Sequence, residues 1–243
     1  MSKYKVKNYN ELESTNTFAL NHIEEFHDKD VIIAQRQVSG RGRFNHEWIS
    51  DDTDNLYMTI VLKPFKIGVF PFQNMTQYLA LKLCEVLEDY GVEASLKWPN
   101  DVLVKGAKIS GILAEGSSHK GKIAAIVLGI GVNLNLKYET LTKISQKATS
   151  LNMILGKKID VEDFSKKLLD KFFDDYETFI NKGFLLIKES YESKCSFLGQ
   201  KIKVSSLSED EFYLAKKINT DGTLTVLDKN NLEIALTTGD LTY

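Results

Sequence analysis

The sequence predicts an α+β protein: a central mixed β-sheet with flanking helices on one side, followed by a small all-β unit at the C-terminus. Two segments with helical spacing of apolar residues, 74–90 and 161–180, indicate long amphipathic helices that cover a sheet. The other segments are short and rich in β-branched residues, as is typical of strands. After about residue 195 short strands alternate with polar turns, which favours a small barrel.

The division into domains follows from this change of pattern. We expect a larger domain at residues 1–195 and a small C-terminal barrel at residues 196–243. A chain of 243 residues is long enough for one sizeable core and one small appended domain.

The N-terminal half begins with a helix that one of three polar residues, Ser14, Thr15 or Asn16, can cap. Gly91 can end the strong second helix in the left-handed conformation. The elements expected in this half are, in order, a helix at 17–26, strands at 31–37 and 55–63, and a helix at 74–90.

The segment 95–115 reads as a turn followed by a β-hairpin. Pro99 fixes φ, the side chains of Asn100 and Asp101 favour a turn, and Lys105-Gly106 suits a tight hairpin turn. The strands expected here are 95–98, 102–104 and 107–115.

Lys108 stands inside the return strand of this hairpin. Strict alternation places it on one face with Ser110 and Ile112, and places Gly111 on the other face. A buried ammonium without a partner costs several kcal/mol, so Lys108 must reach solvent or meet an anion.

The C-terminal half contains a long β-rich run and a helix that starts behind Asp160. Expected elements are a strand run at 122–135, helices at 161–180 and 184–193, and strands at 201–205, 211–218, 224–228 and 232–237.

A glycine- and arginine-rich loop, Gly40-Arg41-Gly42-Arg43, follows the strand at 31–37. Its backbone N–H groups can approach an anion while the guanidinium groups clamp it. A mobile, solvated loop is the alternative for this run taken alone. Together with Lys108, the loop offers fixed cations without an obvious acid–base pair, a set that suits transfer at phosphorus.

The net charge and the cysteine content argue against several classes of protein. The net charge of −2 creates no basic field that would attract nucleic acid or an anionic membrane. Cys84 and Cys195 give neither a disulfide framework nor metal-ligand spacing, and Cys84 fits a buried helix position. No signal peptide or membrane span is visible, so a cytoplasmic location is expected.

The sequence of residues 116–122 matches most of the pattern of a phosphate-binding P-loop. Ile123 stands where a hydroxyl residue would hold Mg²⁺, and a strand follows in place of the required helix, which argues for a plain hairpin turn. The four histidines also lack metal-ligand spacing, so no protein metal site is assigned.

Taken together, the motifs resemble the biotin–protein ligase family, whose members activate biotin as its adenylate and attach it to a carrier lysine. The matching pieces occur in the family's order: Ser14-Thr15-Asn16, Gln37, Gly40-Arg41-Gly42-Arg43, Trp48, Lys97-Trp98-Pro99-Asn100-Asp101, 108–113, 129–135 and 149–151. The resemblance implies a catalytic domain of the class II synthetase-like type, followed by an SH3-like barrel.

The resemblance also implies roles for individual residues. Lys108 and Arg43 are expected to be catalytic, holding the biotin carboxylate and the α-phosphate of ATP. Biotin contacts are expected from Ser14, Thr15, Asn16, Gln37, Gly40, Arg41, Gly42, Arg43, Lys108 and Gly111. Nucleotide contacts are expected from Arg43, Trp48, Asn55, Asn100, Asp101, Lys108 and Asn133. For Asn55, Asn100, Asp101 and Asn133, a turn or strand-end hydrogen bond is an equally good interpretation.

Substrates and partners follow from the same resemblance. They are biotin, ATP with Mg²⁺, and the biotin carboxyl carrier protein of acetyl-CoA carboxylase; a homodimer is possible. Only 13 residues precede Ser14, too few for a helix-turn-helix domain, so a short form without repressor function and without DNA binding is expected. The open alternatives are a lipoate–protein ligase or acyltransferase, and a nucleic-acid module that uses the arginine loop. The acidic balance disfavours the second alternative.

Overall fold

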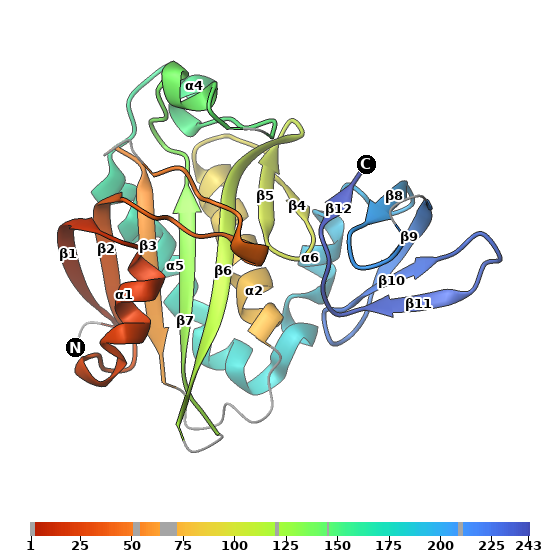
Figure 1. Ribbon diagram of the computed structural model, residues 1–243, viewed down its shortest axis with the longest axis horizontal. Helices are drawn as coiled ribbons and strands as arrows, with labels where there is room; N and C mark the ends of the chain where they lie inside the picture. The colour runs from red at the N-terminus through yellow and green to blue at the C-terminus, as the bar shows by residue number, and fades with distance from the viewer. Residues whose placement is uncertain (1–2, 51–53, 64–71, 120–121, 145, 209–210) are drawn as a thin grey trace.

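The computed structural model describes residues 3–50, 54–63, 72–119, 122–144, 146–208 and 211–243. Its main feature is a seven-stranded sheet with the order β1-β2-β3-β7-β6-β5-β4 (Figure 1). β1 runs parallel to β2 and the other neighbouring strands are antiparallel, so the predicted mixed sheet is confirmed. The strands are β1 Lys5–Leu12, β2 Asp30–Gln37, β3 Leu56–Leu62, β4 Ser95–Lys97, β5 Asp101–Val104, β6 Ala107–His119 and β7 Lys122–Val132.

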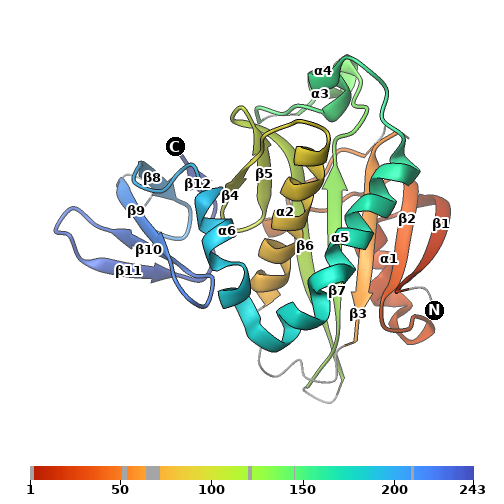
Figure 2. The ribbon, with the colours of Figure 1, turned by 180° about the vertical axis from the view of Figure 1, so that it is seen from behind.

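Helices cover both faces of this sheet. Figure 2 shows the two long helices, α2 (Phe72–Asp89) and α5 (Val161–Lys182), lying across one face. α1 (Thr15–Asn21) packs on the opposite face over a small apolar cluster that includes Ala19 and Val127, so the expectation of helices on one side was wrong. The shorter helices are η1 Ile23–Glu25, η2 Arg43–Asn45, α3 Tyr138–Leu141, α4 Leu151–Leu155, η4 Gly183–Leu186 and α6 Lys188–Ser193.

The core between the sheet and the long helices is aromatic. The side chain of Asp160 caps α5 by accepting a hydrogen bond from the Asp163 N–H at 2.9 Å, as its position before the helix predicts. The rings of Tyr78 and Phe179 stack with centroids 4.2 Å apart, and the Tyr78 hydroxyl donates to the Phe172 carbonyl at 2.7 Å. The aromatic stripe of α5 is therefore core, and the pocket described below lies on the other face of the sheet.

The C-terminal segment folds as a second, five-stranded antiparallel sheet with the order β11-β10-β9-β8-β12. Among the residues that the structure describes, no pairing joins β11 to β12, so closure into the expected barrel is not found. The strands are β8 Lys201–Val204, β9 Tyr213–Ile218, β10 Leu224–Leu227, β11 Glu233–Leu236 and β12 Leu241–Thr242.

A polar turn fixes the second sheet against the first. The Trp98 indole donates to the carbonyl of Gly222 at 3.0 Å, and the Gln77 carboxamide donates to the same oxygen at 2.7 Å. Apolar residues of both parts form one continuous core. The C-terminal sheet is thereby held beside β4 (Figure 1). Its last loop contributes Asp240 to the lining of the pocket. The division at residue 195 stays a prediction.

Trp98 is expected to be a major contributor to stability, since its side chain is 1% exposed and links the two sheets. Trp98→Ala should lower the free energy of unfolding by about 3–5 kcal/mol, through lost burial and a cavity. Phe212→Ala, at a side chain that is 56% exposed, should change it by about 0.5 kcal/mol or less. Urea denaturation measures both; equal effects would contradict this account of the contact.

The predictions about membrane-spanning segments and about Cys84 can be compared with the structure. Among the described residues, no helix combines the length and apolar character needed to cross a membrane. Cys84 is fully buried in α2, as predicted, and burial raises the pKa of its thiol to about 12.

Candidate active site

A cavity of about 450 Å³ is lined by residues of α1, of the loop that follows β2, and of β6 and β7. The structure brings thirteen of the predicted site residues to its lining, whereas Gly40 and Asn55 do not line it. These thirteen are Ser14, Thr15, Asn16, Gln37, Arg41, Gly42, Arg43, Trp48, Asn100, Asp101, Lys108, Gly111 and Asn133.

A β-bulge turns Lys108 into this cavity. Val102 on β5 pairs with Ser110, but the next residue, Leu103, pairs with Lys108, so Ile109 is an extra residue on β6. Strict alternation placed Lys108 and Gly111 on opposite faces, and this was wrong. Both line the cavity, and a Cβ built on Gly111 would lie 3.4 Å from the Lys108 Nζ atom.

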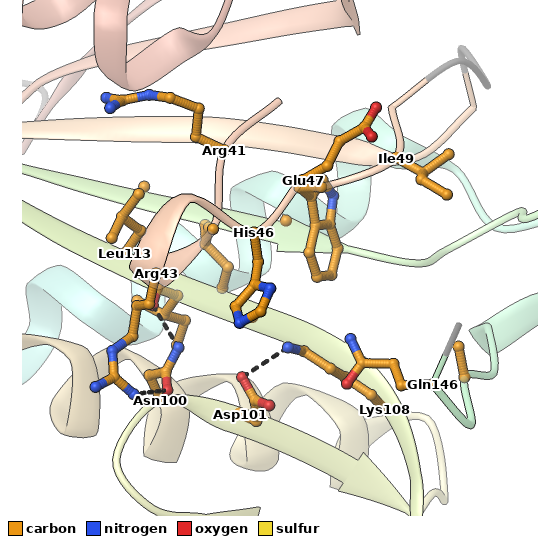
Figure 3. A pocket seen from close by; sticks show the side chains of 18 of the residues that line it. Arg41, Arg43, His46, Glu47, Ile49, Asn100, Asp101, Lys108, Leu113 and Gln146 are labelled. Carbon is orange, nitrogen blue, oxygen red and sulfur yellow. Dashed lines mark hydrogen bonds and ion pairs between the residues drawn. The ribbon is translucent and has the colours of Figure 1, made fainter. Parts of the chain in front are cut away.

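Lys108 has an acidic partner at the bottom of the cavity. Its Nζ atom lies 2.9 Å from the Asp101 Oδ1 atom, and the two side chains are only 16% and 12% exposed (Figure 3). The anion that a lysine in this strand requires is thus supplied by the protein itself. The Lys108 backbone is also fixed, because its N–H donates to the Lys147 carbonyl and its carbonyl accepts from the Thr149 N–H, both at 2.9 Å.

Arg43 is held at the side of the cavity that faces the C-terminal sheet. Its guanidinium donates to the Asn100 Oδ1 at 3.0 Å, the Asp240 Oδ1 at 3.1 Å and the Thr238 Oγ1 at 2.8 Å. Burial lowers the pKa of Arg43, while the charges of Asp240 and Asp101 raise it. The sequence pattern missed Thr238 and Asp240, because nothing in their spacing indicates contact with a loop almost 200 residues earlier.

Neutral polar groups line the other end of the cavity. The Gln37 Oε1 accepts a hydrogen bond from the Thr15 backbone N–H at 2.8 Å, and the Gln37 Nε2 donates to the Ser50 Oγ at 3.1 Å. Ser14 caps α1 and is buried, as are Thr15 and Gln37. Thr59, which the sequence pattern did not single out, places its Oγ1 2.8 Å from the Thr15 Oγ1. This end suits a neutral ligand group that both donates and accepts hydrogen bonds.

Glycines on the central strands make room for the cavity's side chains. A Cβ at Gly131 would lie 2.4 Å from the Trp48 ring, and one at Gly129 would lie 2.3 Å from the Asn16 Oδ1. The glycines of β7 therefore serve side-chain packing at the edge of the cavity. The indole N–H of Trp48 is buried without a hydrogen-bond partner in the described part of the chain.

The asparagines divide into structural and cavity-lining residues. Asn55 is 1% exposed, and its Oδ1 accepts from the Leu134 and Asn135 N–H groups at 2.8 and 2.9 Å, so it holds the chain after β7. Asn133 lines the cavity, yet its Nδ2 donates to the Thr149 carbonyl at 3.0 Å. Asn100 orients Arg43 through its Oδ1 and donates to the Ile112 carbonyl at 2.9 Å.

Metal binding by protein side chains has no support in the described residues. They contain no group of three or more His, Cys, Asp or Glu side chains placed to hold an ion. Of the acidic residues that line the cavity, Asp101 and Asp240 are paired with Lys108 and Arg43, and Glu47 is the third. Lys97, to which no role was assigned in the predicted site, also lines this cavity and adds positive charge.

The fold and the site define an α+β protein with a cation-lined cavity whose far end is neutral and polar. The chain belongs to the Biotin/lipoate A/B protein ligase family, whose model matches residues 10–133.

Relatives agree with this assignment. The bifunctional ligase/repressor BirA of Bacillus subtilis is 29% identical over 196 residues, which is 80% of this chain and 60% of the relative. The chain thus spans about 60% of the length of this bifunctional relative. A biotin–[acetyl-CoA-carboxylase] ligase of Paracoccus denitrificans is 28% identical, covering 87% of this chain and 90% of the relative.

Solved structures are similar over nearly the whole chain. The biotin protein ligase from Aquifex aeolicus in complex with biotin and ATP has a TM-score of 0.83 and 28% identity, with coverage of 98% of this chain and 97% of that one. The Leishmania major ligase in complex with biotinyl-5-AMP is 21% identical with a TM-score of 0.64, which supports the fold.

Proposed function

We propose that this chain activates biotin with ATP as biotinyl-5′-AMP and transfers the biotinyl group to a lysine of a carrier protein. The observation that carries the proposal is the polarity of one cavity. Neutral hydrogen-bonding residues line one end, and Lys108 and Arg43 stand at the other. Biotin has the same order of groups: a neutral ureido ring, an apolar body and chain, and a carboxylate.

Ser14, Thr15 and Gln37 are proposed to hold the ureido ring. Its N–H groups require acceptors and its carbonyl requires donors, and these buried side chains offer both. Trp48, packed against Gly131, supplies an apolar wall beside them. Asn16 and Gly111 complete this part of the proposed biotin site.

In the first half-reaction, a biotin carboxylate oxygen attacks the α-phosphorus of ATP. The new carboxylate–phosphorus bond forms as the bond to the β-phosphate breaks, and pyrophosphate leaves. The carboxylate is already ionised at neutral pH, so the step requires in-line geometry and neutralised charge and needs no base. Lys108 is proposed to bridge the two anions, and Arg43 to hold the α-phosphate.

Mg²⁺ is proposed to enter with ATP, bound mainly to its phosphates, a common arrangement for this ion. Asn100, Asp101 and Asn133 remain the proposed nucleotide-side residues, since all three line the cavity.

In the second half-reaction, the carrier lysine amine attacks the mixed-anhydride carbonyl carbon. An amide bond forms, AMP leaves, and the amine loses a proton. We infer that the catalytic domain spans residues 1–195 and that residues 196–243 contribute through Thr238 and Asp240. The carrier is inferred to be that of acetyl-CoA carboxylase, the enzyme in the name of the Paracoccus relative.

Intact-mass analysis of an acceptor tests this function. A biotin carrier domain incubated with the chain, biotin and Mg-ATP should gain one biotinyl group on its acceptor lysine. A lipoyl domain incubated with lipoate in parallel should stay unmodified. Modification of the lipoyl domain alone would assign the chain to the lipoate branch of its family, and modification of neither would overturn the proposal.

A further inference from the structure

A polar network connects the neutral end of the cavity to the arginine loop, and Glu115 is at its centre. Its members Thr15, Asn16 and Thr59 are buried, whereas the side chains of Arg41 and Glu115 are 41% and 25% exposed. Glu115 lies on β6, and each of its carboxylate oxygens lies 2.9 Å from the Arg41 Nη2 atom. The Asn16 Nδ2 donates to the same carboxylate at 2.9 Å and to the Leu113 carbonyl at 3.1 Å. Glu115 therefore joins a loop residue to a helix residue.

From Asn16 the network continues into the cavity's neutral end. The Asn16 Oδ1 lies 2.7 Å from the Thr59 Oγ1, which lies 2.8 Å from the Thr15 Oγ1. The Thr15 backbone N–H in turn donates to Gln37. Gly129 leaves the space that Asn16 occupies, because any Cβ there would overlap the carboxamide. The neutral end and Glu115 are thus parts of one packed set of hydrogen bonds.

In the structure the arginine loop extends beyond Arg43 and comprises residues 40–48. It is a compact turn held from two sides. Its ends are joined by a hydrogen bond from the Trp48 N–H to the Gly40 carbonyl at 2.9 Å. Figure 3 shows the two arginine side chains extending in different directions, Arg43 toward Asn100 and Arg41 away from it. If Arg43 turns to a phosphate, the Arg41 contact with Glu115 still holds the loop over the cavity.

We propose that Glu115 is a positioning residue that couples occupation of the neutral end to retention of the loop. It acts through Arg41 on one side and Asn16 on the other. An isolated, partly exposed ion pair contributes little to the stability of the contact that it makes. Here the carboxylate also accepts from Asn16, a residue only 3% exposed, so the three groups order one another. This inference rests on the proposed function for its kinetic consequences.

Glu115→Gln is the sharpest test, because it keeps the shape and removes the charge and one acceptor. The KM for biotin should rise about tenfold and release of biotinyl-AMP should quicken by a similar factor, while kcat changes less than about threefold. Arg41→Gln should have the same effects, and the double variant should add little to either one. A purely structural role would lower thermal stability and leave the biotin KM unchanged.

Glu11→Gln is the matched control. It removes a comparable ion pair on the same sheet, in which the Arg36 Nη1 lies 3.1 Å from the Glu11 Oε2, outside the cavity lining. Its biotin KM and adenylate release should equal those of the unmodified chain. Unchanged kinetics in Glu115→Gln, or fully additive effects with Arg41→Gln, would overturn the proposal.

Tryptic cleavage after Arg43 gives a readout that does not depend on activity. Glu115→Gln weakens the contact between Arg41 and Glu115 that holds the loop. It should therefore speed cleavage of the ligand-free chain about tenfold relative to Glu11→Gln, because local opening of the loop exposes the peptide bond after Arg43. Equal cleavage rates would overturn the anchoring role even if the chain made no adenylate. Faster cleavage together with an inactive unmodified chain would instead refute the proposed function alone.

Discussion

Lys108→Ala is expected to lower the rate of adenylate formation by about 10²–10³-fold, the loss typical when one positioned charge-stabilising donor is removed. The ammonium lines the same cavity as Arg43, at the end where the carboxylate and α-phosphate are proposed to meet. Single-turnover release of pyrophosphate measures this rate. A Lys108→Ala chain that forms adenylate at the normal rate would refute the assigned role.

The same substitution has a structural consequence that needs its own control. It leaves the Asp101 carboxylate, only 12% exposed, without its cation, and such a charge is destabilising. The Lys108→Ala/Asp101→Asn double variant removes that charge and should regain thermal stability. At saturating ATP, which offsets any loss of nucleotide binding at Asp101, it should remain as slow as Lys108→Ala, and this separates the chemical role of Lys108 from folding.

Gly131→Ala is expected to weaken biotin binding by about tenfold to a hundredfold. The added methyl group would lie 2.4 Å from the Trp48 ring, so the ring and the loop that carries it must shift. Overpacking of this kind costs about 1–3 kcal/mol, which corresponds to that range of affinity. Isothermal titration with biotin measures the effect.

Two further glycines provide comparisons for Gly131. At Gly111 the nearest Trp48 atom would be 3.1 Å from the new Cβ, so Gly111→Ala should weaken biotin binding less. Gly116 lies on the same sheet at an exposed position outside the cavity, and Gly116→Ala should leave affinity unchanged. The reverse order of effects would contradict the packing observed around Trp48.

Much of the fold could be predicted because its strongest elements carry their own signals. The stripe of α5 and its Asp160 cap, and the φ values of +72° at Gly91 and Gly106, agree with local rules. β1 and β12 were not predicted. β1 is an edge strand whose residues are mostly exposed, so its pattern shows no buried face, and β12 is only two residues long.

The site was predicted as a set of residues and not as an arrangement. The sequence motifs assigned Lys108 and Arg43 to one site. The bulge at Ile109, however, depends on pairing with β5 and has no signal in the local sequence. The partners of the two loop arginines, Glu115 and Asp240, lie 74 and 197 residues from them. Such contacts arise from tertiary structure, which periodicity does not describe.

Oxygen-isotope tracing tests the central claim, that positioned cations join the biotin carboxylate directly to the α-phosphate. The chain is supplied with biotin labelled by ¹⁸O in both carboxylate oxygens, Mg-ATP and a biotin carrier domain, and the AMP is analysed by mass spectrometry. Attack by the carboxylate predicts AMP with one ¹⁸O atom, with the other label retained in the amide. Unlabelled AMP from biotinylated carrier would contradict the mechanism.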